Sequence, residues 1–288
     1  MLEALEVSED VRFGFNPRFV PTSRAAMVRQ LTEALLVAER LEFEVIEISV
    51  TPQMYDFGLG TVFGGAFLEL ISRATPRFHV NILPFDARDG DLGMSDPNPY
   101  PRSLALRRAV HMLEFFESQH PMGLYVIHAG ASRYASETHL ASLRQVLAAL
   151  DTLYPGLPLA MVNDWHGAVL ERPADFLDLL DATPNLRFVF NTGLAWSAAG
   201  YDREAYAWYL RSLGRFDERL AEIHWSGAAP GLGPDQPLHI SAEDGLDAGR
   251  TLGMVGRNPA VVHLFDTVGA HQNALARERR HLYDAGRL

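Results

Sequence analysis

Short apolar segments recur along the chain, and longer amphipathic segments separate them. The apolar segments have the length and β-branched content of strands that are buried on both faces. The predicted strands are 11–15, 44–50, 78–83, 123–128, 157–162, 186–191, 220–225 and 260–265. Apolar positions three to four residues apart predict helices at 24–40, 102–119, 136–152, 173–181, 202–213 and 272–284.

Polar residues at helix starts support this assignment. Thr22 or Ser23 is placed to cap the first helix, and Ser136 to cap the helix at 136–152. Strands that alternate with helices indicate parallel βα units. Eight such units predict a single (β/α)₈ barrel over residues 1–288, with an open doubly wound sheet as the alternative. No GxGxxG sequence follows a predicted strand, which disfavours that alternative.

The amino-acid composition excludes several kinds of catalytic and metal-binding site. Hydrophobic residues make up 48% and charged residues 21%, as in an ordinary globular core. All 25 basic residues are arginine, so lysine Schiff-base chemistry and a P-loop lysine are excluded. The chain has no cysteine, which excludes disulfides, thiolate nucleophiles and cysteine-ligated metals.

The net charge and the hydropathy of the sequence indicate which partners and which cellular location to expect. The net charge of −11 argues against nucleic acid as a partner, because nucleic-acid sites usually carry a basic patch. The acidic N-terminal segment lacks the features of a signal peptide, and no apolar run is long enough to span a bilayer. We expect a cytoplasmic protein without membrane contact, and the sequence leaves a homo-oligomer open.

Two long loops follow predicted strands, at 84–101 and 226–239. In a barrel both would lie on the C-terminal face, where active sites are built. Loops of this length are often functional, although surface decoration explains either one equally well.

Polar residues gather where the predicted strands end. Histidine and aspartate that converge from different strands can hold a divalent metal such as zinc or manganese. A single histidine, however, is more often a hydrogen-bonded core or loop residue. His263 faces either the barrel mouth or the helical layer, because it alternates with Val262 and Leu264. The remaining histidines are assigned to helix surfaces or strand flanks: His79, His111, His120, His139, His271 and His281.

Three of the four tryptophans follow strands five, six and seven: Trp165, Trp196 and Trp225. Tryptophans gathered at a barrel mouth can form a stacking wall for a sugar or a base. The alternative is that they cap the barrel core, as aromatic residues also do.

The strand-end blocks resemble the xylose isomerase-like TIM-barrel superfamily, which includes sugar phosphate isomerases and epimerases and endonuclease IV. Arg102 and Ser103 open the helix before the fourth strand in the manner of that family. The blocks, in chain order, are YVIHAG (125–130), LAMVNDWHG (159–167), FVFNTGLAW (188–196), EIHWSGA (222–228) and VVHLFDT (261–267).

The resemblance implies a barrel that acts on a sugar-like small molecule with the help of a divalent metal. It also implies that most family ligands are replaced here. Val162, Asn191, Leu194 and Phe265 occupy positions that correspond to a glutamate, an aspartate, a histidine and a glutamate of the family. We therefore predict a degenerate metal site in which His128, His224 and either Asp235 or His239 survive.

Several readings of this site stay open. Asp164, His166 or Asp266 could rebuild the metal centre; the protein could bind a ligand without metal; or His128 and His224 could act as acid and base. An endonuclease IV-like phosphoesterase is the weakest reading, because the net charge is −11. The predicted metal ligands are His128, Asp164, His224 and His239, with His128 and His224 also catalytic. The predicted substrate-binding residues are Asn81, Arg102, Arg133, Asn163, Trp165, Asn191, Trp196 and Trp225.

Overall fold

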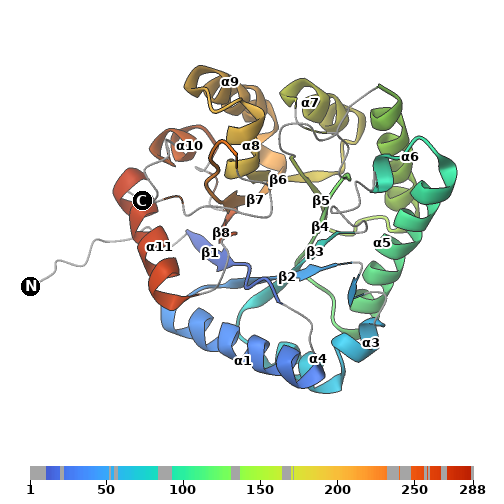
Figure 1. The fold of residues 1–288 in the computed structure, drawn as a ribbon, viewed down its shortest axis with the longest axis vertical. Coiled ribbons are helices and arrows are strands. Elements are labelled where there is room, and N and C mark those ends of the chain that lie inside the picture. Colours follow the sequence, from blue (N-terminus) through green and yellow to red (C-terminus); the bar gives the residue numbers. More distant parts are fainter. Residues whose placement is uncertain are drawn as a thin grey trace, which may run out of the picture.

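Eight parallel strands form a closed barrel in the computed structural model of this chain, and helices surround it (Figure 1). The strands pair in chain order, and β8 returns to pair with β1, as in Arg12 opposite Val262. The prediction of a (β/α)₈ barrel is therefore confirmed. The structure describes residues 11–19, 23–51, 53–54, 58–83, 93–130, 137–163, 170, 172–231, 240, 248–255, 258, 260–266 and 271–286.

All eight predicted strands are present, with ends that differ by up to two residues. They are β1 (Arg12–Phe15), β2 (Val45–Val50), β3 (Arg77–Ile82), β4 (Leu124–Ile127), β5 (Leu159–Val162), β6 (Arg187–Asn191), β7 (Leu220–Trp225) and β8 (Val262–Phe265). Each strand is buried on both faces, which is why its sequence reads as an apolar run.

The six predicted helices are also present: α1 (Arg24–Leu41), α5 (Pro99–Gln119), α6 (Glu137–Leu153), α7 (Pro173–Ala182), α9 (Arg203–Leu213) and α11 (Gln272–Gly286). Ser23 caps α1 by accepting a hydrogen bond from the Ala26 N–H, while Ser136 lies outside the described residues. No helix in the described part of the chain is long and apolar enough to cross a membrane.

In the described part of the chain, four short helices and two 3₁₀ turns were not predicted from sequence periodicity. The helices are α3 (Leu59–Val62), α4 (Gly65–Arg73), α8 (Thr192–Ala198) and α10 (Ala248–Val255), and the turns are η2 (Gly93–Ser95) and η3 (Gly214–Arg219). These segments span at most two or three helical turns, too few to establish a repeat of 3.6 residues.

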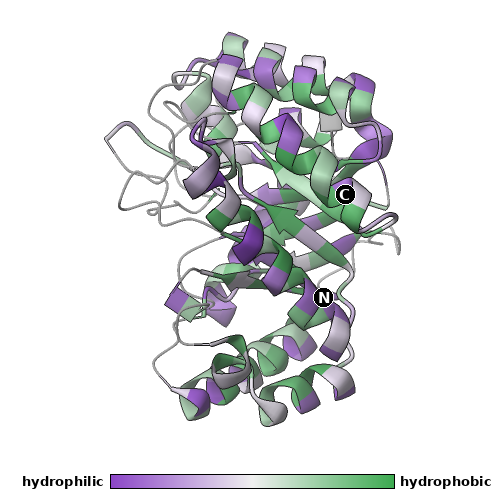
Figure 2. Cartoon of the chain, turned by 90° about the vertical axis from the view of Figure 1, so that its right-hand side faces the viewer, coloured by the Kyte–Doolittle hydropathy of each residue, from purple (hydrophilic) through white to green (hydrophobic). Residues whose placement is uncertain are grey.

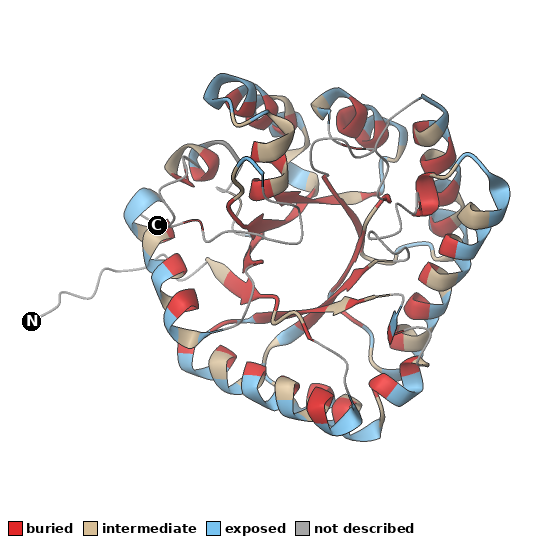
Figure 3. Cartoon of the chain, in the orientation of Figure 1, coloured by how far each residue is buried: buried red, intermediate tan, exposed pale blue. Residues whose placement is uncertain are grey.

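The outer face of the barrel carries the main core. Alternate strand residues point outward and pack against the helices, among them Tyr125, Ile127, Met161 and Phe190. Figure 3 shows the strands mostly buried and the outer faces of the helices exposed, and Figure 2 shows mainly hydrophobic strands inside helices of mixed character. A separate apolar cluster fills the lumen beside β4–β7: Leu124, Val126, Ala160, Val162, Val189 and Ala221.

A bulge in β7 decides which of its side chains enter the lumen. Phe188 of β6 pairs with Leu220, whereas the next residue, Val189, pairs with Glu222. The extra residue, Ala221, belongs to this apolar cluster in the lumen, so Ala221 and Glu222 share the inner face. Beyond the bulge, normal alternation turns His224 inward and Trp225 outward.

His263 of β8 faces the helical layer, which was one of its two predicted orientations. Its ring stacks on Trp225, with centroids 6.0 Å apart, and its Nδ1 accepts a hydrogen bond of 3.1 Å from the Trp225 Nε1–H. Burial lowers the pKa of His263 to about 4. The ring is therefore neutral near pH 7, with its proton on Nε2.

We expect His263 to make the fold acid-sensitive. Its pKa is lowered in the folded state, so the unfolded chain takes up the proton first, and stability falls as the pH drops from about 6.5 toward about 4. Between pH 7 and pH 5 this group should cost roughly 2 kcal/mol of unfolding free energy. Urea denaturation at both pH values should show a smaller loss for His263→Gln. His271→Gln, at an exposed position, should behave as wild type; equal losses in all three proteins would contradict the prediction.

Candidate functional site

Four charged or ionisable side chains cross the lumen of the barrel from opposite sides. Glu47 comes from β2, His79 from β3, and Glu222 and His224 from β7, and none is more than 7% exposed. His79 Nδ1 forms a hydrogen bond with Glu222 Oε1. His224 Nε2 lies 3.1 Å from Glu222 Oε2 and 3.2 Å from Glu47 Oε2. Together these four residues form a continuous group that we call the lumen cluster.

The side chains of the lumen cluster keep one another in the charged state by shifting one another's pKa values. Burial alone would lower the pKa of His224, but Glu47 and Glu222 outweigh it and keep this pKa well above its ordinary value. Burial would raise the pKa of Glu222, yet His79 and His224 hold it at about 2. In the metal-free protein His224 is therefore an imidazolium between two carboxylates.

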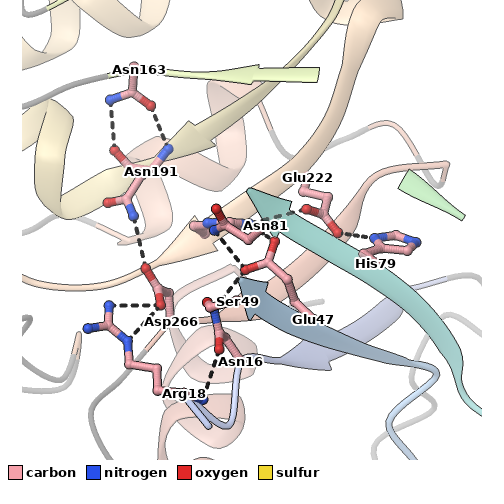
Figure 4. A network of polar contacts seen from close by, with 11 residues as sticks. Asn16, Arg18, Glu47, Ser49, His79, Asn81, Asn163, Asn191, Glu222 and Asp266 are labelled. Atoms are coloured by element: carbon pink, nitrogen blue, oxygen red, sulfur yellow. Dashed lines mark hydrogen bonds and ion pairs between the residues drawn. The ribbon is translucent and has the colours of Figure 1, made fainter. Parts of the chain in front are cut away.

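The carboxylate of Glu47 is oriented by two amide side chains. Its Oε1 accepts hydrogen bonds from Asn16 Nδ2 (2.8 Å) and Asn81 Nδ2 (3.1 Å), and Asn16 Nδ2 also contacts Ser49 Oγ at 2.8 Å (Figure 4). Glu47 Oε2 is buried and has no hydrogen-bond partner among the described residues, although it faces His224 Nε2. One oxygen is thus used by the two amides, and the other meets only the positive charge of His224.

His79 is held deep in the barrel. A Cβ atom on Gly123 would lie 2.9 Å from His79 Nε2, so a larger residue at this position would displace the ring. The assignment of His79 to a strand flank is therefore wrong. In a strand buried on both faces, alternation alone does not say which side is the lumen.

A second polar network lies toward the C-terminal ends of the strands. Asn191, at the end of β6, caps α8 through its Oδ1, which also accepts from Ser226 Oγ, and its Nδ2 donates to Asp266 Oδ2 at 3.3 Å. Asp266 Oδ1 accepts from Arg18 Nη2 at 2.9 Å and from Nε at 3.2 Å. Figure 4 shows this chain of contacts running from Asn163 to Arg18. It ties β1, β6 and β8 together at the rim.

His128 follows β4 and is half-buried. Burial, and then the positive charge of His224, lower its pKa to about 4, although Asp266 opposes the shift. Its ring makes no hydrogen bond within the described part of the chain. His128 is therefore a neutral imidazole near pH 7, with one ring nitrogen that can accept a proton and an N–H that can donate a hydrogen bond.

The structure separates the residues predicted to bind metal. His224 joins Glu47 and Glu222, and the ligand atoms of these three side chains lie within 4.8 Å of one another. His128 lies outside this group of three, although it is close enough for the charge of His224 to lower its pKa. Asp164 and His239 fall outside the described residues.

The predicted substrate-binding amides have different environments. Both ends of the Asn163 amide are used by the backbone of Asn191, at 3.1 and 2.6 Å. The side-chain amide of Asn191 is likewise used, because it accepts hydrogen bonds from the Leu194 N–H and Ser226 Oγ and donates one to Asp266. Asn81 differs, because its Oδ1 is buried without a hydrogen-bond partner among the described residues.

The predicted tryptophan wall does not form from Trp196 and Trp225. Trp225 is fully buried on the outer face of the barrel, and Trp196 packs edge-on against Tyr201 and Tyr206. Both occupy core positions, which was the alternative reading. Trp165 and Arg133 lie outside the described residues.

The guanidinium of Arg102 forms hydrogen bonds within the protein. Its Nη1 donates to the backbone oxygen of Asp96 at 2.8 Å and to Ser142 Oγ at 2.9 Å. These contacts join the start of α5 to α6.

Sequence reasoning missed Glu47 and Glu222. Each interrupts an otherwise apolar strand, in VIEISV and LAEIHW. A carboxylate inside such a run is costly unless it is paired, and this was the available signal. By contrast, Val162 and Phe265, where the resemblance implies family carboxylates, are buried apolar residues that face the lumen and the helices respectively.

The comparison with solved structures supports the fold. No protein-family model and no curated protein matches the sequence. A xylose isomerase domain-containing protein from Salmonella typhimurium aligns with a TM-score of 0.68 and 11% identity, over 97% of this chain and 98% of that one. A candidate sugar phosphate isomerase/epimerase from Anabaena variabilis gives 0.62 and 13%, over 92% and 88% of the chains.

A third structure, a candidate 3-DHS dehydratase from Bacillus anthracis, gives a TM-score of 0.64 and 12% identity over 94% and 98% of the chains. Its name describes a dehydration, whereas that of the Anabaena protein describes an isomerisation or epimerisation. Similarity at this level of identity shows the fold, and the reaction must be argued from the site itself.

Removing one charge from the lumen cluster should destabilise the protein strongly. Glu222→Gln leaves His79 and His224 without their shared carboxylate, which should lower the unfolding free energy by about 3 kcal/mol or more. Urea denaturation of chelator-treated protein measures this loss. Glu204→Gln, whose side chain is 82% exposed, should stay within about 0.5 kcal/mol of wild type. A similar small effect at Glu222 would show that the cluster carries no such energy.

Proposed function

We propose that Glu47, Glu222 and His224 hold one divalent metal ion, zinc or manganese, and that the protein uses this centre to bind and convert a sugar-like small molecule. The observation that carries the proposal is the buried Oε2 of Glu47. It has no hydrogen-bond partner in the described part of the chain, yet it lies 3.2 Å from His224 Nε2, which is itself 3.1 Å from Glu222 Oε2.

The donor set fits such an ion. Two carboxylate oxygens and one imidazole nitrogen are ligands that zinc and manganese both accept. Three protein ligands are also typical of catalytic centres, which keep a position for water or substrate. His79 orients Glu222, and Asn16 and Asn81 orient Glu47, as outer partners of metal ligands commonly do.

The centre would supply polarisation of a substrate carbonyl or hydroxyl oxygen. The remaining chemistry falls to side chains of the chain itself. His128 is neutral near pH 7, with a pKa of about 4, and can take a proton from a substrate group at the rim. The apolar cluster beside β4–β7 excludes water from the other half of the lumen, which strengthens every charge interaction across it.

The structural neighbours support the substrate class. Two of them are named for xylose isomerase domains or sugar phosphate isomerisation, and they share this fold over most of their length. The ligands proposed here come from β2 and β7, so the site is a rebuilt version of what the resemblance implies. The alternative hypothesis is that the protein binds a ligand without metal, in which case the proton stays on His224.

Metal content tests the proposal. Tag-free protein purified without chelators should contain about one equivalent of zinc or manganese by plasma mass spectrometry. Glu47→Gln keeps an oxygen for Asn16 and Asn81 but removes the ligand charge. It should weaken binding by more than 100-fold, since loss of outer partners alone typically costs about 10- to 100-fold.

Two comparisons make this experiment decisive. Glu204→Gln, an exposed carboxylate, should retain full metal content. If wild type binds no metal, even after incubation with zinc and manganese, the proposal is wrong and metal-free ligand binding is favoured instead. If metal is present, isomerase and epimerase assays on sugars and sugar phosphates follow, with abasic-site DNA as the assay for the phosphoesterase alternative.

Metal uptake should release a proton. The pKa of His224 is held well above its ordinary value, so its Nε2 must lose a proton before it can bind an ion. Calorimetric titration with zinc near pH 7, in buffers of different ionisation enthalpy, should report about one proton released per ion and tighter binding at higher pH. An enthalpy that does not change with the buffer would place the binding site elsewhere.

A further inference from the structure

Helix α9 exposes a large aromatic residue on the outside of the molecule. Its inner face is buried through Tyr206, Tyr209 and Leu210, and Figure 1 shows the helix at the outer edge of the protein. Trp208 lies on the opposite face and is 49% exposed. Tryptophan is highly buried on average, whereas it is enriched among the residues that contribute most to protein–protein contacts. The exposed indole therefore marks this side of α9 as a contact surface.

Charges of opposite sign flank Trp208. Glu204 precedes it by four residues and Arg211 follows it by three, so the three side chains lie on one side of the helix. The Glu204 side chain is 82% exposed and meets Arg250 at a distance of 4.0 Å. The Arg211 side chain is exposed and forms no hydrogen bond or ion pair with any residue that the structure describes. We call Glu204, Trp208 and Arg211 the α9 face.

The α9 face complements itself when it is turned end to end. In a two-fold pair with antiparallel helices, Glu204 of each copy faces Arg211 of the other, and the two Trp208 rings meet near the axis. A pair with parallel helices would instead set like charges against each other. The helix dipole also favours an acid near the start of α9 and a base near its end, but it does not account for a tryptophan between them.

We propose that the α9 face is the contact between two copies of this chain, related by a two-fold axis that passes beside Trp208. A second copy supplies both matching charges and a second aromatic ring, which are the features that a partner of this face requires. Contacts of one helix pair lie at the small end of protein interfaces, so we expect a dissociation constant on the order of 10 μM. The proposal is independent of the metal centre, because α9 belongs to the outer helical layer.

Sedimentation velocity of the full chain, from about 1 to about 300 μM, should show wild type passing from monomer to dimer. Trp208→Ala should raise the dissociation constant about tenfold or more, since a central aromatic residue carries much of the binding energy. Leu36→Ala is the matched control. Leu36 is 48% exposed on α1, and its loss should leave the dissociation constant unchanged.

Charge reversal tests the antiparallel arrangement. Glu204→Arg sets basic ends against each other and Arg211→Glu sets acidic ends against each other, so each variant alone should associate at least about tenfold more weakly than wild type. An equimolar mixture of the two variants restores opposite charges at both contacts and should form a heterodimer with near wild-type affinity. Reversal is used because neutralising one exposed ion pair changes little.

The outcomes decide between the α9 face and other arrangements. A wild type that stays monomeric up to about 300 μM overturns the proposal, as does an unchanged dissociation constant in Trp208→Ala. If wild type dimerises but the mixture associates no better than either variant alone, the antiparallel contact is wrong. Association of the mixture supports the contact and shows that both variants are folded, so their weak self-association cannot come from misfolding.

Discussion

The His224 imidazolium between the carboxylates of Glu47 and Glu222 is the interaction on which the barrel interior depends. A charge in the lumen is costly unless an opposite charge meets it, and here each charge is met from across the barrel. The two strands that carry them, β2 and β7, lie on opposite sides of the lumen, with β1 and β8 between them on one side and β3 to β6 on the other. The cluster therefore constrains the register of strands that do not pair with each other.

The rest of the lumen follows from this constraint. An apolar cluster fills the space beside β4–β7, where a further charge would lack a partner. Toward the mouth, Asn191, Asp266 and Arg18 satisfy one another across β6, β8 and β1. The described lumen thus combines an apolar wall, a group of paired charges and a polar rim.

Structures that share this barrel are named for different reactions. The structural neighbours share the barrel at 11–13% identity, and their names describe different reactions. In this chain apolar residues stand where the resemblance implies ligands, and carboxylates stand on β2 and β7 instead. The proposed function therefore rests on the donor atoms that this sequence brings together.

The sequence by itself determined the strands, the main helices and the barrel, because strands buried on both faces and helices with one apolar stripe leave a strong local pattern. It also pointed to His224 and Asn81. Only the tertiary structure decided which strand faces enter the lumen. The bulge at Ala221 turns Glu222 and His224 inward and Trp225 outward, and the cross-barrel contacts of Glu47 and His79 join residues far apart in the chain. Pairing of this kind depends on closure of the barrel, which no local pattern encodes.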